Sequence, residues 1–183
     1  MAKSMKEERQ NSSGSCGTAA RPHYMISYTT HSLEARQIAK TLYYELSRRK
    51  VRGKPCRVWW DKRESDVSEA SMKRAAERCH TFIAILSGPC QSPAVPARPE
   101  AENAYFRRSW CEKEIRWRLE SRYSDDIVLL ADEKEHTDIG ALVATCPRDL
   151  HYLFDDFTVR RPAMHSPAFL ETTMRDFFPK ATL

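Results

Sequence analysis

The sequence predicts an α/β domain in which a five-stranded parallel sheet carries helices on both faces. Short apolar runs of strand length alternate with longer segments whose apolar residues recur every three or four positions, as in parallel sheets. The run at 81–87 is continuously apolar, which indicates a central strand covered on both sides. The predicted strands are 23–28, 56–60, 81–87, 126–131 and 151–154.

The helices are predicted from the spacing of apolar residues and from their caps. Ser32 stands where an N-cap residue is expected, and Ile38, Leu42 and Leu46 follow at intervals of four. The same spacing predicts helices at 72–79, from 109 onward, at 137–145 and from 167 to 178. Ser166 and Pro167 are the expected N-cap and first residue of the last helix, with Leu170, Met174 and Phe177 on one face.

The chain divides into a tail, one domain and an insertion. Residues 1–21 are polar and lack an apolar period, so we expect a disordered N-terminal tail. The domain is predicted to span 22–179. Four prolines between 89 and 99 interrupt it, which indicates a proline-rich insertion over 88–106; long loops of this kind are often functional lids.

Composition narrows the function classes. The 183 residues are 41% hydrophobic and 10% aromatic, which excludes wholesale disorder, and no apolar run approaches the roughly 20 residues of a membrane-spanning helix. The first 21 residues lack the apolar core of a secretory signal, and six scattered cysteines form no disulfide or metal pattern. We therefore expect a cytoplasmic, reducing location and no metal site. The net charge of +5 is interspersed, so nucleic-acid binding is not expected.

The segment that begins at Ser109 carries the strongest chemical signal. Ser109 and Glu112 form a predicted capping box, which leaves Glu114 without a structural role. Trp110 and Glu114 are four residues apart and share one helical face, next to a separate apolar stripe that packs on the sheet. Two alternatives stay open: Glu114 is a functional carboxylate, or it is an ordinary exposed glutamate paired with Arg118.

The order of motifs resembles that of a TIR (Toll/interleukin-1 receptor) domain over about residues 22–178. Ile26-Ser27-Tyr28 is similar to the end of the first TIR strand, and Val58-Trp59-Trp60-Asp61 to the end of the second. The run 83–87, followed by Ser-Trp-Cys-x-x-Glu at 109–114, is similar to the third strand and the helix that carries the family's glutamate.

The resemblance implies a flavodoxin-like three-layer fold and a set of site residues. In the enzymatic members the glutamate of this run is catalytic, which corresponds here to Glu114, and its aromatic residue, here Trp110, lies near the nicotinamide of NAD+. The loop after the first strand, here Thr29 and Thr30, lines the same pocket in the family. Tyr28 and Asp61 end the first two predicted strands and are predicted substrate-binding residues, although Asp61 could instead cap the next segment. Lys62, Arg63, Arg107 and Arg108 are cations that could meet the pyrophosphate.

The resemblance implies an NAD+ glycohydrolase of immune or cell-death signalling, with cyclisation of ADP-ribose left open. Cleavage of the nicotinamide–ribose bond creates an oxocarbenium-like ribose, which one carboxylate can stabilise without a cofactor or metal. The implied partners are NAD+ and other TIR domains in a homo-oligomer. The alternatives are a non-enzymatic TIR adaptor that acts by self-association and, less favoured, a nucleoside deoxyribosyl transferase.

Overall fold

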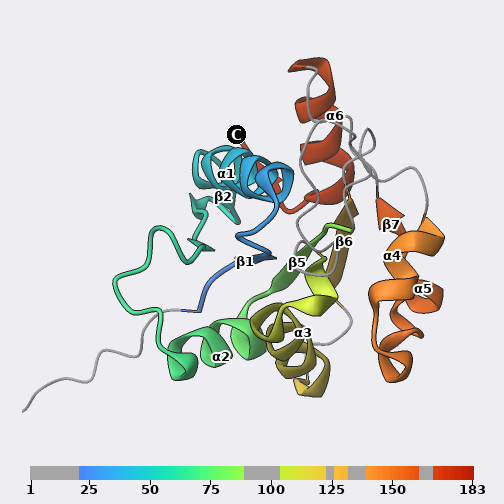
Figure 1. The fold of residues 1–183 in the computed structure, drawn as a ribbon. Helices are drawn as coiled ribbons and strands as arrows, with labels where there is room; N and C mark the ends of the chain where they lie inside the picture. The colour runs from blue at the N-terminus through green and yellow to red at the C-terminus, as the bar shows by residue number, and fades with distance from the viewer. Residues whose placement is uncertain (1–20, 89–103, 123–125, 132–138, 161–166) are drawn as a thin grey trace, which may run out of the picture.

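The computed structural model describes residues 21–88, 104–122, 126–131, 139–160 and 167–183. The predicted tail at 1–21 (apart from Arg21), most of the 88–106 insertion and the expected cap Ser166 lie outside these ranges. The described chain forms a five-stranded parallel sheet of order β4-β1-β5-β6-β7 with helices on both faces, which confirms the predicted α/β flavodoxin-like fold (Figure 1). Its strands are β4 Val58–Trp59, β1 Tyr24–Tyr28, β5 Thr81–Leu86, β6 Ile127–Ala131 and β7 Val159–Arg160.

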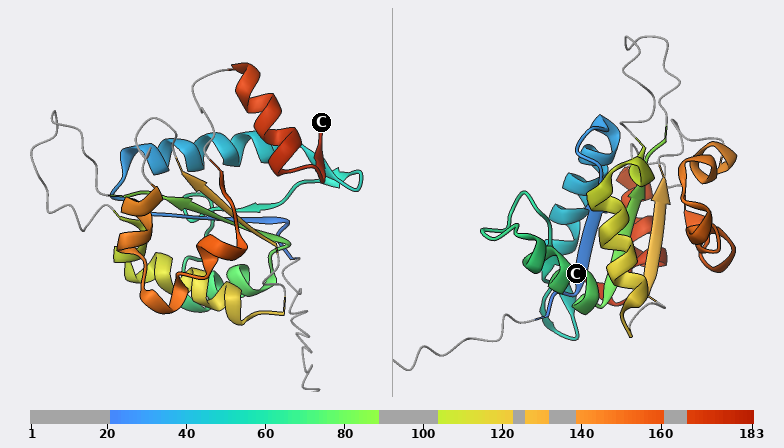
Figure 2. Two further views of the ribbon diagram at one scale, coloured as in Figure 1. Left: turned by 90° about the vertical axis from the view of Figure 1, so that its right-hand side faces the viewer. Right: turned by 60° about the horizontal axis from the view of Figure 1, so that its bottom comes forward.

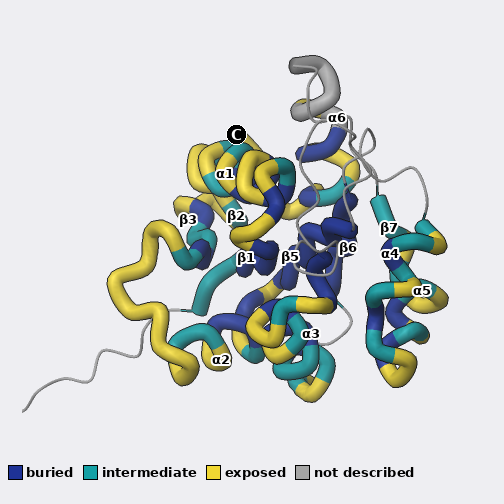
Figure 3. The backbone as a smooth tube through the Cα atoms, viewed as in Figure 1, coloured by how far each residue is buried: buried dark blue, intermediate teal, exposed yellow. Residues whose placement is uncertain are grey.

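Two apolar clusters cover the two faces of the sheet. Helices α1 (Leu33–Ser47) and α6 (Pro167–Phe177) pack on one face. Helices α2 (Glu69–Arg78), α3 (Ser109–Glu120), α4 (Ile139–Thr145) and α5 (Leu153–Asp156) pack on the other (Figure 2). Every residue of β1, β5 and β6 is buried, as Figure 3 shows, which agrees with the continuous apolar runs of these strands.

The first helix forms as its sequence predicts. The Ser32 hydroxyl accepts a hydrogen bond from the backbone N–H of Ala35 at 3.1 Å, which satisfies a donor of the first turn. Ile38, Leu42 and Leu46 are all buried against the sheet. In α6, Met174 and Phe177 lie in the same cluster, whereas the side chain of Leu170 is not described.

The predicted capping box at the start of α3 is wrong. The short 3-10 turn η1 (Tyr105–Arg107) leads directly into α3, so Arg108 takes the N-cap position and its carbonyl accepts from the N–H of Glu112. Ser109 is therefore the first residue of the helix, and Arg108 makes no side-chain cap. The Glu112 carboxylate pairs with Arg116 at 2.8 Å.

The predicted fifth strand at 151–154 is also wrong. Residues 148–150 form the 3-10 turn η2, and α5 follows at Leu153–Asp156. Leu150 and Leu153 are both buried, and their separation of three residues suits a helical turn. The fifth strand is β7, which pairs in parallel with β6 through Leu129 and Val159.

A small antiparallel sheet that the sequence did not indicate joins the C-terminal end to the first half of the chain. It consists of β3 (Lys54–Pro55), β2 (Lys50–Val51) and β8 (Ala181–Thr182). Arg52 and Gly53 connect β2 to β3 with φ angles of 53° and 75°, the left-handed pair that a two-residue hairpin turn requires. Across the described ranges, the helices are too short or too polar to cross a membrane.

Candidate active site

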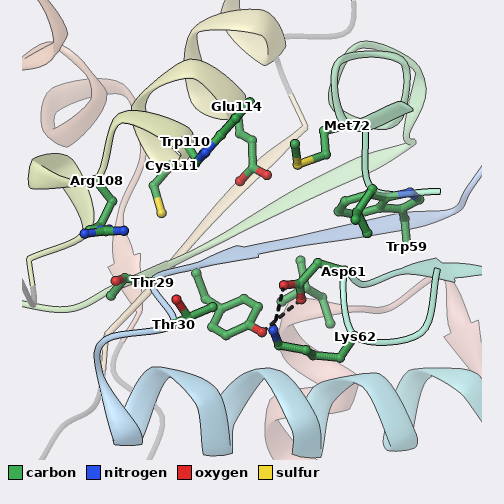
Figure 4. A pocket seen from close by; sticks show the side chains of 13 residues that line it. Thr29, Thr30, Trp59, Asp61, Lys62, Met72, Arg108, Trp110, Cys111 and Glu114 are labelled. Atoms are coloured by element: carbon green, nitrogen blue, oxygen red, sulfur yellow. Dashed lines mark hydrogen bonds and ion pairs between the residues drawn. The ribbon is translucent and has the colours of Figure 1, made fainter. Parts of the chain in front are cut away.

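A cavity of about 350 Å³ opens beyond the carboxyl ends of β1 and β4 (Figure 4). Strand β1 is one of the two strands at which the sheet order reverses, and ligands bind beside such switch points in open parallel sheets. The walls come from β1 and the loop after it, from β4 and its loop, from α2, and from the start of α3. The lining residues are Ile26, Tyr28, Thr29, Thr30, Trp59, Asp61, Lys62, Val67, Met72, Arg108, Trp110, Cys111 and Glu114.

Glu114 points from the second turn of α3 into this cavity (Figure 4). The residue is only 7% exposed, and its Oε2 accepts a hydrogen bond of 2.5 Å from the Ser27 hydroxyl of β1. Burial raises the pKa of Glu114 to about 7; the bond from Ser27 lowers it, and the charge of Asp61 raises it. The carboxyl group therefore exists in both protonation states near neutral pH.

The alternative of an exposed Glu114 paired with Arg118 is wrong. Arg118 is fully buried, and its guanidinium donates to three backbone carbonyls, those of Cys79, His80 and Asp126, at 2.8 to 3.1 Å. These carbonyls lie at the start of β5 and of β6. Arg118 thus ties α3 to the sheet and leaves Glu114 to the cavity.

Asp61 and Tyr28 form a second polar group in the wall. The Tyr28 hydroxyl donates to Asp61 Oδ1 at 2.9 Å, and Lys62 Nζ lies 3.5 Å from Asp61 Oδ2. Burial, followed by the neighbouring Asp61 charge, raises the pKa of Tyr28, so its hydroxyl remains a donor. Asp61 is thus held in place by a neutral donor and a cation, while its charge acts on Glu114.

The other predicted residues at the first loop and on α3 also reach the cavity. Thr29 is buried, and its Oγ1 accepts from the backbone N–H of His31 at 3.2 Å, which stabilises the turn; Thr30 is exposed beside it. Trp110 is 42% exposed and lines the cavity, with the Lys113 ammonium 4.6 Å from the centre of its ring. One face of the indole is thus already next to a cation.

Arg63 is a predicted site residue that does not line the cavity. Its guanidinium donates to the Tyr44 hydroxyl and lies 5.6 Å and 5.9 Å from the ring centres of Tyr44 and Tyr43 on α1. Tyr43 and Tyr44 give the guanidinium a hydrogen bond and two aromatic faces, so it turns toward α1. Lys62 and Arg108 are the cations that do line the cavity, and Arg107 is exposed outside it.

Sequence reasoning missed two kinds of residue. Trp59 is not among the predicted site residues, yet it is buried and part of the cavity wall, together with Met72 from α2. Ser27 and Tyr105 were assigned no role, yet their hydroxyls lie 2.6 Å apart behind Glu114. The one serine in the otherwise apolar run at 24–28 is the sequence feature that could have identified Ser27, whereas no comparable feature marks Tyr105.

The described residues show neither a reactive cysteine nor a metal-binding cluster. Cys56, Cys79, Cys111 and Cys146 are free and buried. Burial raises the pKa of the Cys111 thiol well above its usual range, so the thiol is protonated and unreactive although it lines the cavity. In the ranges described, no three His, Cys, Asp or Glu side chains are grouped so that they could hold a metal ion.

No protein-family model matches the chain, and no curated protein matches it. The site itself consists of a buried carboxylate, a partly exposed indole, a second carboxylate and two cations, all lining one cavity.

Proposed function

We propose that this chain is a TIR-type NAD+ glycohydrolase, which cleaves the bond between nicotinamide and ribose. The observation that supports this most strongly is the position of Glu114, a buried carboxylate that points into the cavity beside Trp110. These two residues are also those that the TIR resemblance assigns to catalysis and to nicotinamide binding.

The reaction needs a carboxylate more than it needs an acid. As the C1′–N bond breaks, its electron pair passes to the pyridinium nitrogen, so nicotinamide leaves as a neutral ring and the ribose becomes positively charged. The ionised Glu114 stabilises this charge from a buried position, where its own charge is little screened by solvent. Water then attacks C1′ and loses a proton, giving ADP-ribose; attack by an adenine nitrogen instead gives the cyclic product.

The size of the cavity suits part of the substrate. A volume of about 350 Å³ is at the small end of the range of ligand pockets, so we place only the nicotinamide and its ribose inside. The cationic nicotinamide stacks on the indole face of Trp110 that Lys113 leaves open. Asp61 accepts from ribose hydroxyls, and Lys62 and Arg108 meet the pyrophosphate at the edge.

The release of nicotinamide from NAD+ tests this proposal. Wild type, Glu114→Gln and Glu112→Gln are compared over a wide range of protein concentrations, because TIR domains act as oligomers. Glu112 is the matched control: it lies on the same helix, pairs with Arg116 on the surface and does not line the cavity. We expect release by wild type and by Glu112→Gln, and a loss of at least a hundredfold in Glu114→Gln.

The same preparations separate the alternatives. No release by wild type at any concentration, together with self-association, would favour the non-enzymatic adaptor. A deoxynucleoside and a free base supplied in place of NAD+ test deoxyribosyl transfer, which also uses a glutamate; base exchange that is faster than nicotinamide release would favour that reaction.

A further inference from the structure

Three side chains behind the cavity form one line of hydrogen bonds. The Tyr105 hydroxyl lies 2.6 Å from Ser27 Oγ, and Ser27 Oγ lies 2.5 Å from Glu114 Oε2. They come from η1, β1 and α3, so segments far apart in the sequence meet at this point. The bond to Glu114 is at the short end for O–H···O bonds, as expected where the acceptor is a carboxylate.

Which group donates in each of these two hydrogen bonds follows from the number of protons that each group carries. Ser27 has one hydroxyl proton, and an ionised Glu114 can only accept, so Ser27 donates to Glu114. The Tyr105 hydroxyl must then donate to Ser27. Burial raises the pKa of Tyr105 well above its usual range, so this hydroxyl keeps its proton. Each proton in the line therefore points toward the carboxylate.

We propose that Tyr105 is a positioning residue for Glu114. Its hydroxyl donates to Ser27 Oγ, so the single Ser27 proton is donated to Glu114 Oε2, and Glu114 Oε1 remains turned toward the substrate. This inference rests on the proposed function of Glu114 and deepens it. Tyr105 acts only through Ser27, and neither residue lines the cavity.

The line orients the carboxylate and does not carry protons to it. Ser27 is 1% exposed and Tyr105 is fully buried, packed edge-to-face on Phe106 with ring centres 5.1 Å apart. The line therefore ends inside the protein, away from solvent. Since a buried carboxyl with no donor would favour its neutral form, the donated proton keeps a larger fraction of Glu114 ionised.

The other titratable groups that line the cavity with Glu114 come from β1, from the loop after β4 and from the start of α3. Asp61 and Lys62 lie after β4, Tyr28 ends β1, and Arg108 precedes α3, all lining the same cavity. On α3 itself Cys111 is a protonated thiol, and α2 contributes the uncharged Met72 to the lining. Variants of Ser27 and Tyr105 leave all of these groups in place, so a changed titration of Glu114 reports on the line alone.

The test is a titration of the Glu114 carboxyl carbon by NMR in protein labelled with 13C-glutamate, the signal being assigned with Glu114→Gln. We expect the midpoint to rise by about half a unit in Tyr105→Phe and by about one unit in Ser27→Ala. Ser27→Thr, which keeps a hydroxyl, should restore the wild-type midpoint. Tyr24→Phe is the matched control, because Tyr24 is also a buried tyrosine but packs with α1 and Phe178 on the opposite face.

Nicotinamide release supplies the second readout. We expect Tyr105→Phe to lose about threefold and Ser27→Ala about tenfold in kcat/KM near pH 5.5, with both within about twofold of wild type near pH 9, because the loss follows the midpoint. An unchanged NMR midpoint in both variants would overturn the positioning role, and so would an activity loss that is equal at all pH values. A shifted midpoint without any nicotinamide release would support the positioning of Glu114 and refute the proposed reaction.

Discussion

Replacing Glu114 by glutamine should stabilise the fold in a way that depends on pH. The glutamine keeps an oxygen that accepts from Ser27, so the geometry of the site is preserved while the titrating group is lost. Burial raises the pKa of Glu114 from 4.5 in a flexible peptide to about 7 in the fold. The folded protein thus holds this proton more tightly than the unfolded chain does.

The sign and size of the effect follow from this difference. A raised carboxyl pKa contributes stability that is complete below about pH 4.5 and is lost as the pH rises through about 7. A difference of about 2.5 units corresponds to roughly 3 kcal/mol over the whole range, and to about 2–3 kcal/mol between about pH 5 and pH 8. Over that interval, the free energy of unfolding of Glu114→Gln should rise relative to wild type by this amount.

Denaturant unfolding at several pH values measures this difference directly, because all other titrating groups are shared and cancel. Glu112→Gln again serves as the control: its carboxylate pairs with Arg116 on the surface, so its difference from wild type should stay within about 1 kcal/mol at every pH. A difference between Glu114→Gln and wild type that does not change with pH would refute the argument that burial perturbs Glu114.

Three further changes have expected outcomes. Asp61→Asn should move the midpoint of the pH profile of nicotinamide release to lower pH, because the Asp61 charge raises the pKa of Glu114; an upward shift would contradict the electrostatic coupling. Trp110→Ala should raise the KM for NAD+ about 2- to 30-fold, which corresponds to the loss of about 0.5–2 kcal/mol of cation–π stacking. Because Trp110 is partly exposed, the variant should unfold at nearly the same temperature as wild type. An unchanged KM would exclude stacking. Arg118→Ala should lower the free energy of unfolding by about 3 kcal/mol or more, since three buried carbonyls lose a charged donor; a loss below about 1 kcal/mol in denaturant unfolding would be inconsistent with that role.

The local sequence pattern predicted those helices and strands whose structure depends mainly on their own residues. The apolar runs of β1, β5 and β6 and the spacing of four in α1 predicted elements that the structure contains. The shared face of Trp110 and Glu114 likewise follows from helical geometry alone, and both line the same cavity. The prediction of a strand at 151–154 was wrong because Leu150 and Leu153 are buried on one side of a helical turn. This arrangement depends on packing in the folded protein, which the local sequence does not show.

The environment of Glu114 could not be predicted from the sequence because it depends on tertiary contacts with other elements. A glutamate in the middle of a helix is usually exposed. Glu114 is buried instead, and the Ser27 hydroxyl of β1 donates the hydrogen bond that its carboxylate needs there. The buried position of Arg118 depends on carbonyls at the ends of two strands, which the sequence of α3 does not reveal. Arg63 is predicted to bind the substrate because its positive charge could meet the pyrophosphate, but two tyrosines of α1 hold its guanidinium instead.

The rate of nicotinamide release from NAD+ as a function of pH tests the central claim most directly. For wild type, kcat/KM should rise with pH along a single limb whose midpoint is near 7, the pKa at which Glu114 becomes ionised. In Glu114→Gln the rate should be at least a hundredfold lower, with that limb absent. A Glu114→Gln variant that releases nicotinamide as fast as wild type, with the same dependence on pH, would contradict the account.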